Sequence, residues 1–130
     1  MKNQQQIINK IIELAKADSS IAVVWLYGSR AKRTASETSD FDLAIAFNHD
    51  LLSSKADDFY SQDLACDWSS KLNVDISIID INKVPTPLAY NVINEGIVIQ
   101  SNNDYRRLSE ERRVWSLWEE YKYEYQRINS

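Results

Sequence analysis

The stretch that decides the fold runs from residue 21 to residue 45 and reads IAVVWLYGSRAKRTASETSDFDLAI. Two apolar runs, one over residues 21–27 and one that begins in this stretch and covers residues 40–47, are rich in β-branched, aromatic and aliphatic side chains, which favour buried strands. Gly28-Ser29 ends the first run, and a short helix is expected from Arg30 to Ala35. The stretch therefore predicts a strand, a tight turn with one short helix, and a second strand.

Hydrophobic periodicity outlines the elements on either side of this stretch. Apolar residues recur at helical spacing in some segments and form short continuous runs in others. We expect helices over residues 4–17, 54–72, 88–95 and 104–127, and further strands over residues 74–79 and 97–100. This order predicts an α/β fold in which helices flank a small mixed β-sheet, with a long C-terminal helix.

The composition is typical of one globular domain. The chain has 130 residues with only 2 Gly and 2 Pro, and no Ser-rich or Pro-rich stretch marks a linker. We therefore expect a single domain over residues 1–130, with its core at about 21–100.

Charge and apolar patterning exclude some classes of protein. A net charge of -4 argues against a surface that wraps duplex nucleic acid. The apolar runs are far shorter than the ~20 residues that cross a bilayer. The single cysteine, Cys66, cannot form an internal disulfide and is expected to pack as a small hydrophobe; cytoplasm is the expected location. His49 is expected in an exposed turn, with no role.

Two aspartates on the second predicted strand are candidate ligands for a catalytic metal ion. Side chains alternate along a strand, so Asp40 and Asp42 should point to the same face, with Phe41 on the other. Two carboxylates held close together repel one another unless a cation lies between them. Hard oxygen ligands favour magnesium or manganese over zinc.

A third carboxylate can join the pair if the next strand is its neighbour. Asp75 lies near the start of that strand, whereas Asp80, the rival ligand, lies at its far end. Three convergent aspartates could hold two metal ions, which would stabilise both the attacking and the leaving oxygen of an in-line displacement.

The turn after the first strand is a candidate phosphate site. Backbone N–H groups at Gly28 and Ser29 could hold the β- and γ-phosphates, and a glycine permits close approach. Among the cations that follow, Arg30 is our first choice to neutralise the triphosphate, ahead of Lys32 and Arg33.

The C-terminal helix allows two interpretations. Its aromatic residues could pack on the domain's own core or form a partner interface, where Trp and Tyr are enriched. They are Trp115, Trp118, Tyr121 and Tyr125. Its arginines are expected on a solvated face, paired with Glu110 and Glu111 at helical spacing. They are Arg106, Arg107, Arg112 and Arg113.

Gly28-Ser29, ten residues, then Asp40-Phe41-Asp42 and a later Asp75 resembles the signature of the polymerase-β-like nucleotidyltransferase superfamily. The short chain without an added substrate domain is similar to the minimal nucleotidyltransferase (MNT) group, whose members are commonly encoded beside a HEPN-domain ribonuclease toxin. One departure is Arg33, where many relatives have glycine.

The resemblance implies a set of roles. Asp40 and Asp42 would bind both of two Mg²⁺ ions, and Asp75 would bind the catalytic one and help to deprotonate the acceptor. Gly28 and Ser29 would hold the triphosphate. ATP would be the donor and a tyrosine of the HEPN toxin the acceptor, so that the chain would act as an antitoxin.

Two other functions stay open. One is nucleotidylation of a small molecule such as an aminoglycoside, although relatives that do this usually carry an additional helical domain. The other is neutralisation of a toxin by binding alone, through the aromatic C-terminal helix. A nucleic-acid polymerase is the least favoured, because the chain is acidic and has no evident template-binding domain.

Overall fold

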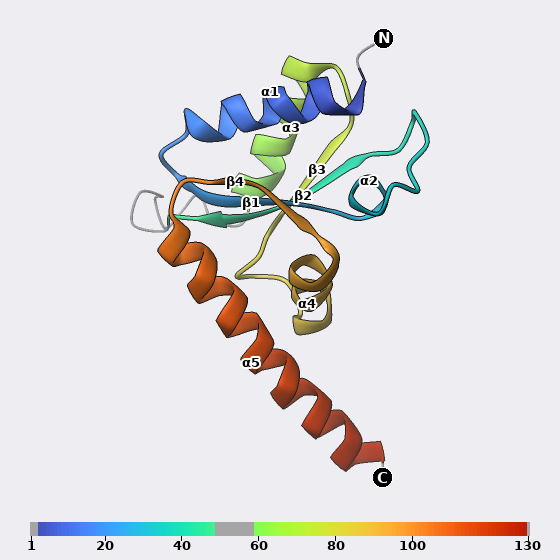
Figure 1. Ribbon diagram of the computed structural model, residues 1–130, viewed down its shortest axis with the longest axis vertical. Helices are drawn as coiled ribbons and strands as arrows, with labels where there is room; N and C mark the ends of the chain where they lie inside the picture. Colours follow the sequence, from blue (N-terminus) through green and yellow to red (C-terminus); the bar gives the residue numbers. More distant parts are fainter. Residues whose placement is uncertain (1–2, 49–58, 130) are drawn as a thin grey trace.

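The structure is a computed structural model that describes residues 3–48 and 59–129 (Figure 1). Its helices are α1 (Gln4–Lys16), α2 (Ser29–Lys32), α3 (Tyr60–Leu72), α4 (Thr86–Glu95) and α5 (Asp104–Asn129). Its strands are β1 (Ile21–Tyr27), β2 (Phe41–Phe47), β3 (Ile76–Asp80) and β4 (Ile97–Ser101). His49 and the first part of the helix expected over 54–72 lie outside the described residues.

The strands form one sheet in the order β3-β2-β1-β4. β1 pairs antiparallel with both β2 and β4, whereas β2 and β3 run parallel. α3 lies within the crossover that a parallel pair requires, because the chain must return to the same end of the sheet before β3 begins. The predicted α/β fold with a small mixed sheet flanked by helices is confirmed.

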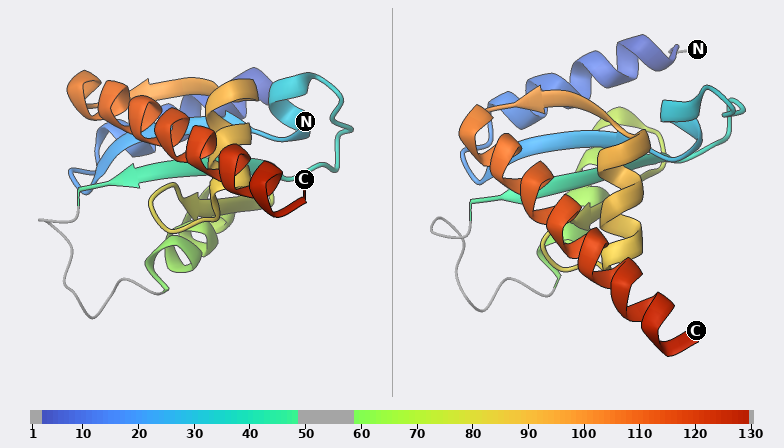
Figure 2. Two further views of the ribbon diagram at one scale, coloured as in Figure 1. Left: turned by 90° about the horizontal axis from the view of Figure 1, so that it is seen from below. Right: turned by 60° about the horizontal axis from the view of Figure 1, so that its bottom comes forward.

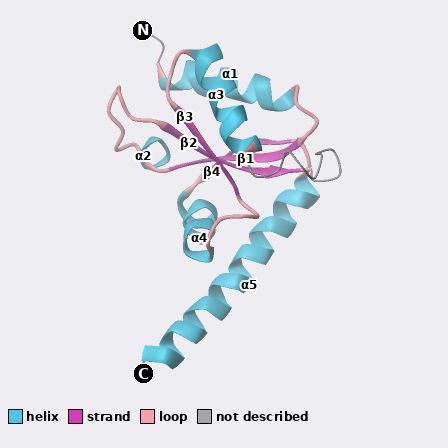
Figure 3. Ribbon diagram, turned by 180° about the vertical axis from the view of Figure 1, so that it is seen from behind, coloured by secondary structure: helices cyan, strands magenta, loops and turns pink. Residues whose placement is uncertain are grey.

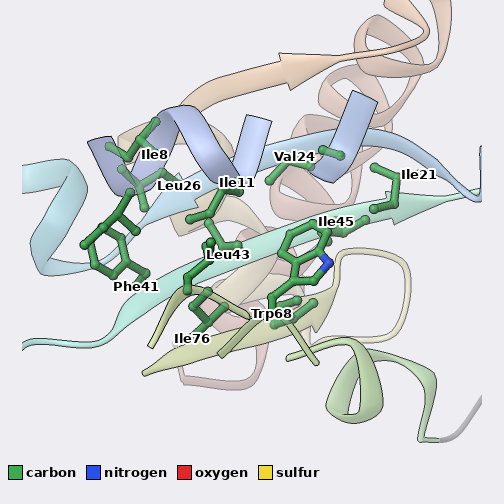
Figure 4. Close-up of a cluster of buried hydrophobic side chains, with 14 of the residues drawn as sticks. Ile8, Ile11, Ile21, Val24, Leu26, Phe41, Leu43, Ile45, Trp68 and Ile76 are labelled. Atoms are coloured by element: carbon green, nitrogen blue, oxygen red, sulfur yellow. The ribbon is translucent and has the colours of Figure 1, made fainter. Parts of the chain in front are cut away.

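Helices cover both faces of the sheet (Figures 2 and 3). One face buries Ile11 of α1 and Trp68 of α3 against Leu43 of β2 (Figure 4). The opposite face buries Val92 of α4 and Val114 of α5 against Trp25 of β1. Alternate residues of the central strands therefore face different cores, which fixes their register, because a slip by one residue would exchange the two faces.

The strands that carry the aspartates begin later than expected. β2 begins at Phe41 rather than Asp40, and β3 begins at Ile76 rather than Val74. Asp40 and Asp75 therefore lie immediately before their strands, where the backbone leaves the buried part of the sheet. α4 begins at Thr86 rather than Leu88, because Pro87 is tolerated in a helix's first turn.

The C-terminal helix is only partly packed on the domain. Its first half buries Val114, and Trp115 contacts Tyr90 of α4 edge-on at 5.2 Å between ring centroids. Tyr90 stacks on Trp118 at 4.3 Å, and the row of rings continues to Tyr121. The second half of α5 extends away from the sheet (Figure 1). The interpretation that the aromatic residues pack on the domain's own core thus holds for Trp115 and Trp118, which contact α4.

Cys66 lies on the exposed side of α3. It forms no disulfide, and its exposure shows that the expectation of a buried, packed side chain was wrong. Its position on α3 faces away from the core that Trp68 and Leu72 enter. Across the described residues, no helix is long and apolar enough to cross a membrane.

Replacing Arg33 with glycine is expected to stabilise the protein by about 1 kcal/mol, the usual cost of a left-handed conformation for a residue with a Cβ. Arg33 ends α2 with φ 60°, which accounts for the shortened helix. Urea denaturation of both proteins measures the change. The control is Thr34→Gly, which removes the neighbouring side chain where no positive φ is present and should not stabilise. Equal effects of the two substitutions would contradict this explanation.

Candidate active site

The candidate site lies where β1 ends and β2 begins. Tyr27, the last residue of β1, pairs with Asp42 of β2, so the turn that follows β1 is held beside that carboxylate. Gly28 adopts φ 73°, a conformation that favours glycine. A Cβ added there would overlap the Asp42 Oδ2 atom. The turn therefore requires glycine for two reasons, its backbone conformation and the space beside Asp42.

Asp40 and Asp42 form a like-charged pair at the start of β2. Phe41 between them enters the core under α1 and α3, so the Asp42 side chain points to the opposite face. Burial raises the pKa of the half-buried Asp42 carboxyl, and repulsion from Asp40 raises it further. Both effects disfavour the charged form. A bound cation would relieve the repulsion and supply the charge that the desolvated carboxylate lacks.

Tyr27 belongs to the same site, although it was not predicted from the sequence. Burial and the charge of Asp42 raise the pKa of its hydroxyl to about 12. The hydroxyl therefore stays protonated at neutral pH and can donate a hydrogen bond without adding negative charge. The signal that could have identified it is its position directly before Gly28, opposite the predicted Asp40-Phe41-Asp42 strand.

Asp75 lies beside the pair, as the expected strand order requires. The backbone N–H of Phe41 donates to the Asp75 carbonyl oxygen at 2.9 Å, and Asp42 pairs with Ser77 in the parallel ladder. Alternation along this segment places the Asp75 side chain on the same face as Asp42. Asp75 is exposed, as is Asp40.

Asp80, the rival third ligand, faces the other way. It pairs with Ile45, which enters the core under α1, and its carboxylate accepts the backbone N–H of Asn82 at 2.9 Å. Over residues 3–48 and 59–129, no group of three or more His, Cys, Asp or Glu side chains is gathered closely enough to hold a metal ion. The structure thus aligns three aspartates on neighbouring strands without bringing their carboxylates together.

Arg30 contacts the segment that leads into Asp40. Its guanidinium donates to the carbonyl oxygens of Ser39 at 2.8 Å and Glu37 at 3.3 Å, and lies 4.2 Å from the centroid of the Phe41 ring. It also donates to the Gln4 side chain of α1 at 3.3 Å. These contacts place the guanidinium on the Phe41 side of β2, opposite Asp42. The predicted contact with phosphate stays a prediction.

Lys32, a further cation of the phosphate turn, is tied to α4. Its Nζ lies 2.8 Å from the Glu95 carboxylate, and both side chains are about half exposed. Such a pair contributes little stability. It nevertheless connects the helix after Gly28 with the helix that covers the aspartate face.

The sequence and the fold both match known proteins. The family described as "Polymerase beta, Nucleotidyltransferase" matches residues 9–105. The chain is similar to the protein adenylyltransferase MntA of Shewanella oneidensis, with 29% identity over 94 residues. That match covers 72% of this chain and 64% of the relative, so the chain aligns with a little under two thirds of the relative's length.

Several solved structures with the same fold are chains of toxin–antitoxin complexes. A chain of a toxin–antitoxin complex with AMP-PNP superposes with a TM-score of 0.75 and 25% identity, covering 93% of this chain and 94% of that one. A chain of a tri-AMPylated Shewanella oneidensis HEPN toxin in complex with MNT antitoxin gives a TM-score of 0.73 and 24% identity, covering 97% and 95%.

Proposed function

Because the chain belongs to the polymerase beta nucleotidyltransferase family, we propose that it is an antitoxin that transfers AMP from ATP to a tyrosine of a partner HEPN ribonuclease toxin. The observation that carries the proposal is the Asp40 and Asp42 pair beside the Gly28 turn, with the pKa of Asp42 raised by burial and by repulsion. A site of this kind favours a cation and an anionic substrate. The named activity of the relative and the complexes described above support the choice of donor and acceptor.

The chemistry of the carboxylate donors fits a divalent metal, although the described residues do not gather three of them around one point. Asp40 and Asp42 supply hard oxygen ligands at the start of β2, and Asp75 lies immediately before the neighbouring strand β3. We propose that these three aspartates hold two Mg²⁺ ions. When bound, the ions would neutralise charge on the triphosphate and on the leaving pyrophosphate.

The remaining residues bind and orient the reactants. Gly28 and Ser29 are proposed to bind the triphosphate, since the turn leaves no side chain between its backbone and Asp42. Arg30 is proposed to assist, chiefly by fixing the segment before Asp40 through the Ser39 carbonyl.

The transfer itself is a single displacement. The acceptor tyrosine oxygen attacks the α-phosphorus, forming a P–O bond while the bond to the β-phosphate oxygen breaks and pyrophosphate leaves. Asp75 is proposed to accept the hydroxyl proton. The pKa of the Tyr27 hydroxyl is raised to about 12, so this hydroxyl keeps its own proton at neutral pH. It therefore does not compete with Asp75 for the proton that the attacking tyrosine releases. We place this reaction in the cytoplasm, where ATP is available.

Neutralisation by binding alone is the second candidate, and one observation favours it. Tyr121 and Tyr125 continue the row of stacked rings beyond α4 and are both exposed. Exposed aromatic residues are common in partner interfaces. Binding through α5 and transfer at Asp42 can also occur in the same complex.

Intact-mass spectrometry of the partner toxin tests the proposal. The purified chain, Mg²⁺, ATP and its HEPN toxin should give a gain of one or more AMP groups on the toxin. The double variant Asp40→Asn, Asp42→Asn should give none. The matched control Asp63→Asn, Asp67→Asn removes two carboxylates from α3 and should transfer normally. A stable complex without any mass gain, with each of the four nucleoside triphosphates, would favour binding alone.

A further inference from the structure

Gln4, the first residue of α1, is hydrogen-bonded to Arg30 in both directions. Its side-chain Nε2 donates to the Arg30 carbonyl oxygen at 3.2 Å, and its Oε1 accepts from the Arg30 guanidinium at 3.3 Å. Both bonds are partly buried, and the two residues are 26 positions apart in the chain. The N-terminal end of α1 is therefore joined to the segment that follows the Gly28 turn.

The start of α1 is itself held in place by its cap and by the core. The Asn3 side chain accepts the backbone N–H of Gln6, and the Gln6 side chain accepts the backbone N–H of Asn3, which together form a capping box. Within the first turn, Ile7 enters the core that contains Phe41. Fraying of this helix end, which would release Gln4, must break the capping box.

The Arg30 guanidinium contacts the chain on both sides of Asp40. It donates to the Ser39 carbonyl oxygen from Nη2 at 2.8 Å and from Nε at 3.3 Å, and it lies 4.2 Å from the centroid of the Phe41 ring. A further bond reaches the Glu37 carbonyl oxygen at 3.3 Å. The residue before Asp40 and the residue after it are thus held by one planar group, which only an arginine side chain can supply.

These neighbours determine where Asp40 lies relative to the other aspartates. Asp40 is exposed and lies outside the ladders that β2 forms with β1 and β3. The backbone N–H of Phe41, the next residue, donates to the Asp75 carbonyl oxygen at 2.9 Å, and Asp42 follows on β2. The position of Asp40 beside Asp42 and Asp75 therefore depends on contacts made by its two chain neighbours.

We propose that Gln4 is a positioning residue for Asp40: it orients the Arg30 guanidinium, which in turn fixes the backbone on both sides of Asp40. This inference rests on the proposed binding of Mg²⁺ by the aspartates. It adds the N-terminal helix to the support of the metal site. Outer contacts that orient a metal ligand typically change metal affinity about 10–100-fold.

Hydrogen exchange tests the positioning without requiring a metal ion. Gln4→Ala removes both bonds to Arg30, whereas Arg30→Lys keeps the charge but cannot present a planar fork to the Ser39 carbonyl. In both variants, mass spectrometry should show faster amide exchange over residues 36–41 than in the wild type. The N–H groups of Ser39 and Phe41 in this segment are hydrogen-bonded to backbone carbonyl oxygens, so loosening of the segment exposes them.

Metal binding tests the consequence for the site. The affinity for Mn²⁺, a substitute for Mg²⁺ that electron paramagnetic resonance detects, is measured on the full chain with AMP-PNP present. It should fall by about tenfold in both Gln4→Ala and Arg30→Lys, at the lower end of the usual range for such contacts. If Arg30 acted only as a positive charge beside the triphosphate, Arg30→Lys would instead bind Mn²⁺ like the wild type, which would contradict the inference.

The matched control is Gln5→Ala, because Gln5 donates to the Asn9 side chain at 2.9 Å on the exposed side of α1. It should change neither the exchange nor the Mn²⁺ affinity, and urea denaturation should show that each variant is folded. Unchanged exchange over residues 36–41 in Gln4→Ala, or faster exchange with undiminished Mn²⁺ affinity, would overturn the inference. Faster exchange in both variants of a chain whose wild type binds no Mn²⁺ would support the positioning of Asp40 and contradict the proposed metal site.

Discussion

Gly28→Ala is expected to reduce AMP transfer by about a hundredfold or more, because a displacement of roughly 1 Å at a reacting centre can cost that much. The new methyl group would overlap the Asp42 Oδ2 atom, so the carboxylate must move or the turn must open. The backbone at φ 73° adds strain for any residue that has a Cβ. Gly28→Ala should therefore abolish most AMP transfer, although it removes no functional group from the site.

The rate of AMP incorporation measures the loss of transfer, and urea denaturation measures the loss of stability. The loss of stability should be about 1–3 kcal/mol, typical of a strained backbone position. In the double variant Gly28→Ala, Asp42→Ala the overlapping oxygen is absent, so part of that loss should be recovered while transfer stays absent.

Gly96→Ala is the comparison variant for stability alone. A Cβ there would overlap the carbonyl oxygen of Val92 and lie against that of Leu26, and it would not meet Asp42. It should destabilise the protein yet reduce transfer far less than Gly28→Ala at a temperature where both are folded. Normal transfer by Gly28→Ala would show that the turn does not have to lie close to Asp42.

Local sequence patterns were sufficient to predict the elements, and they correctly placed Asp40 near Asp42. Alternation along a strand led to the second prediction, although β2 begins only after Asp40, and a glycine after an apolar run indicates a turn. The position of Asp75 needed one further assumption, that the second and third strands are neighbours, and their parallel pairing confirms it.

The contacts that could not be predicted from the sequence join residues that are distant in the chain. Arg30 reaches Gln4 across 26 positions, and Arg106 reaches the carbonyl oxygen of Phe47 across 59. A cavity of about 990 Å³ likewise combines α1, the segment before β2 and the link from α3 to β3. Periodicity along a single segment contains no information on such pairs, because they depend on how the elements pack.

The arginines of α5 also show that helical periodicity does not reveal how a helix packs against the rest of the domain. Arg106, Arg107 and Arg113 do pair with Glu110 or Glu111 at helical spacing, as expected. The expectation of a solvated face was wrong for Glu110, whose side chain is 6% exposed. Helical spacing correctly predicted the partners but could not show that this part of the helix lies against the sheet.

Glu110→Gln is accordingly expected to destabilise the protein by roughly 3 kcal/mol, as when one member of a buried ion pair is removed. The carboxylate accepts from Arg106 Nε at 2.8 Å, Arg113 Nε at 2.9 Å and Asn82 Nδ2 at 3.0 Å. Arg106 also donates to the carbonyl oxygen of Phe47 at 3.1 Å. The network thus fastens α5 to the end of β2, so its loss should release α5 from the sheet.

The pH dependence of this loss gives a second measurement. Burial raises the pKa of Glu110, but hydrogen bonds from Asn82, Arg106 and Arg113 and the charge of Arg113 outweigh it and hold the pKa below its ordinary value of 4.5. A lowered pKa in the folded state contributes stability at pH values above 4.5, and this contribution disappears as the pH falls through the folded-state pKa. The difference in unfolding free energy between wild type and Glu110→Gln should therefore be constant near pH 7 and shrink below pH 4.5.

Glu111→Gln is the matched control for this prediction. Its side chain is 29% exposed and pairs with Arg107 at 3.2 Å, so its loss should cost less than about 1 kcal/mol, the usual limit for such pairs. Similar losses for the two variants would mean that α5 is held by its apolar contacts at Val114 rather than by the Glu110 network. A large loss for Glu110→Gln alone would instead show that the helix bearing the exposed tyrosines is fixed by one buried carboxylate, at the end of the sheet opposite Asp42.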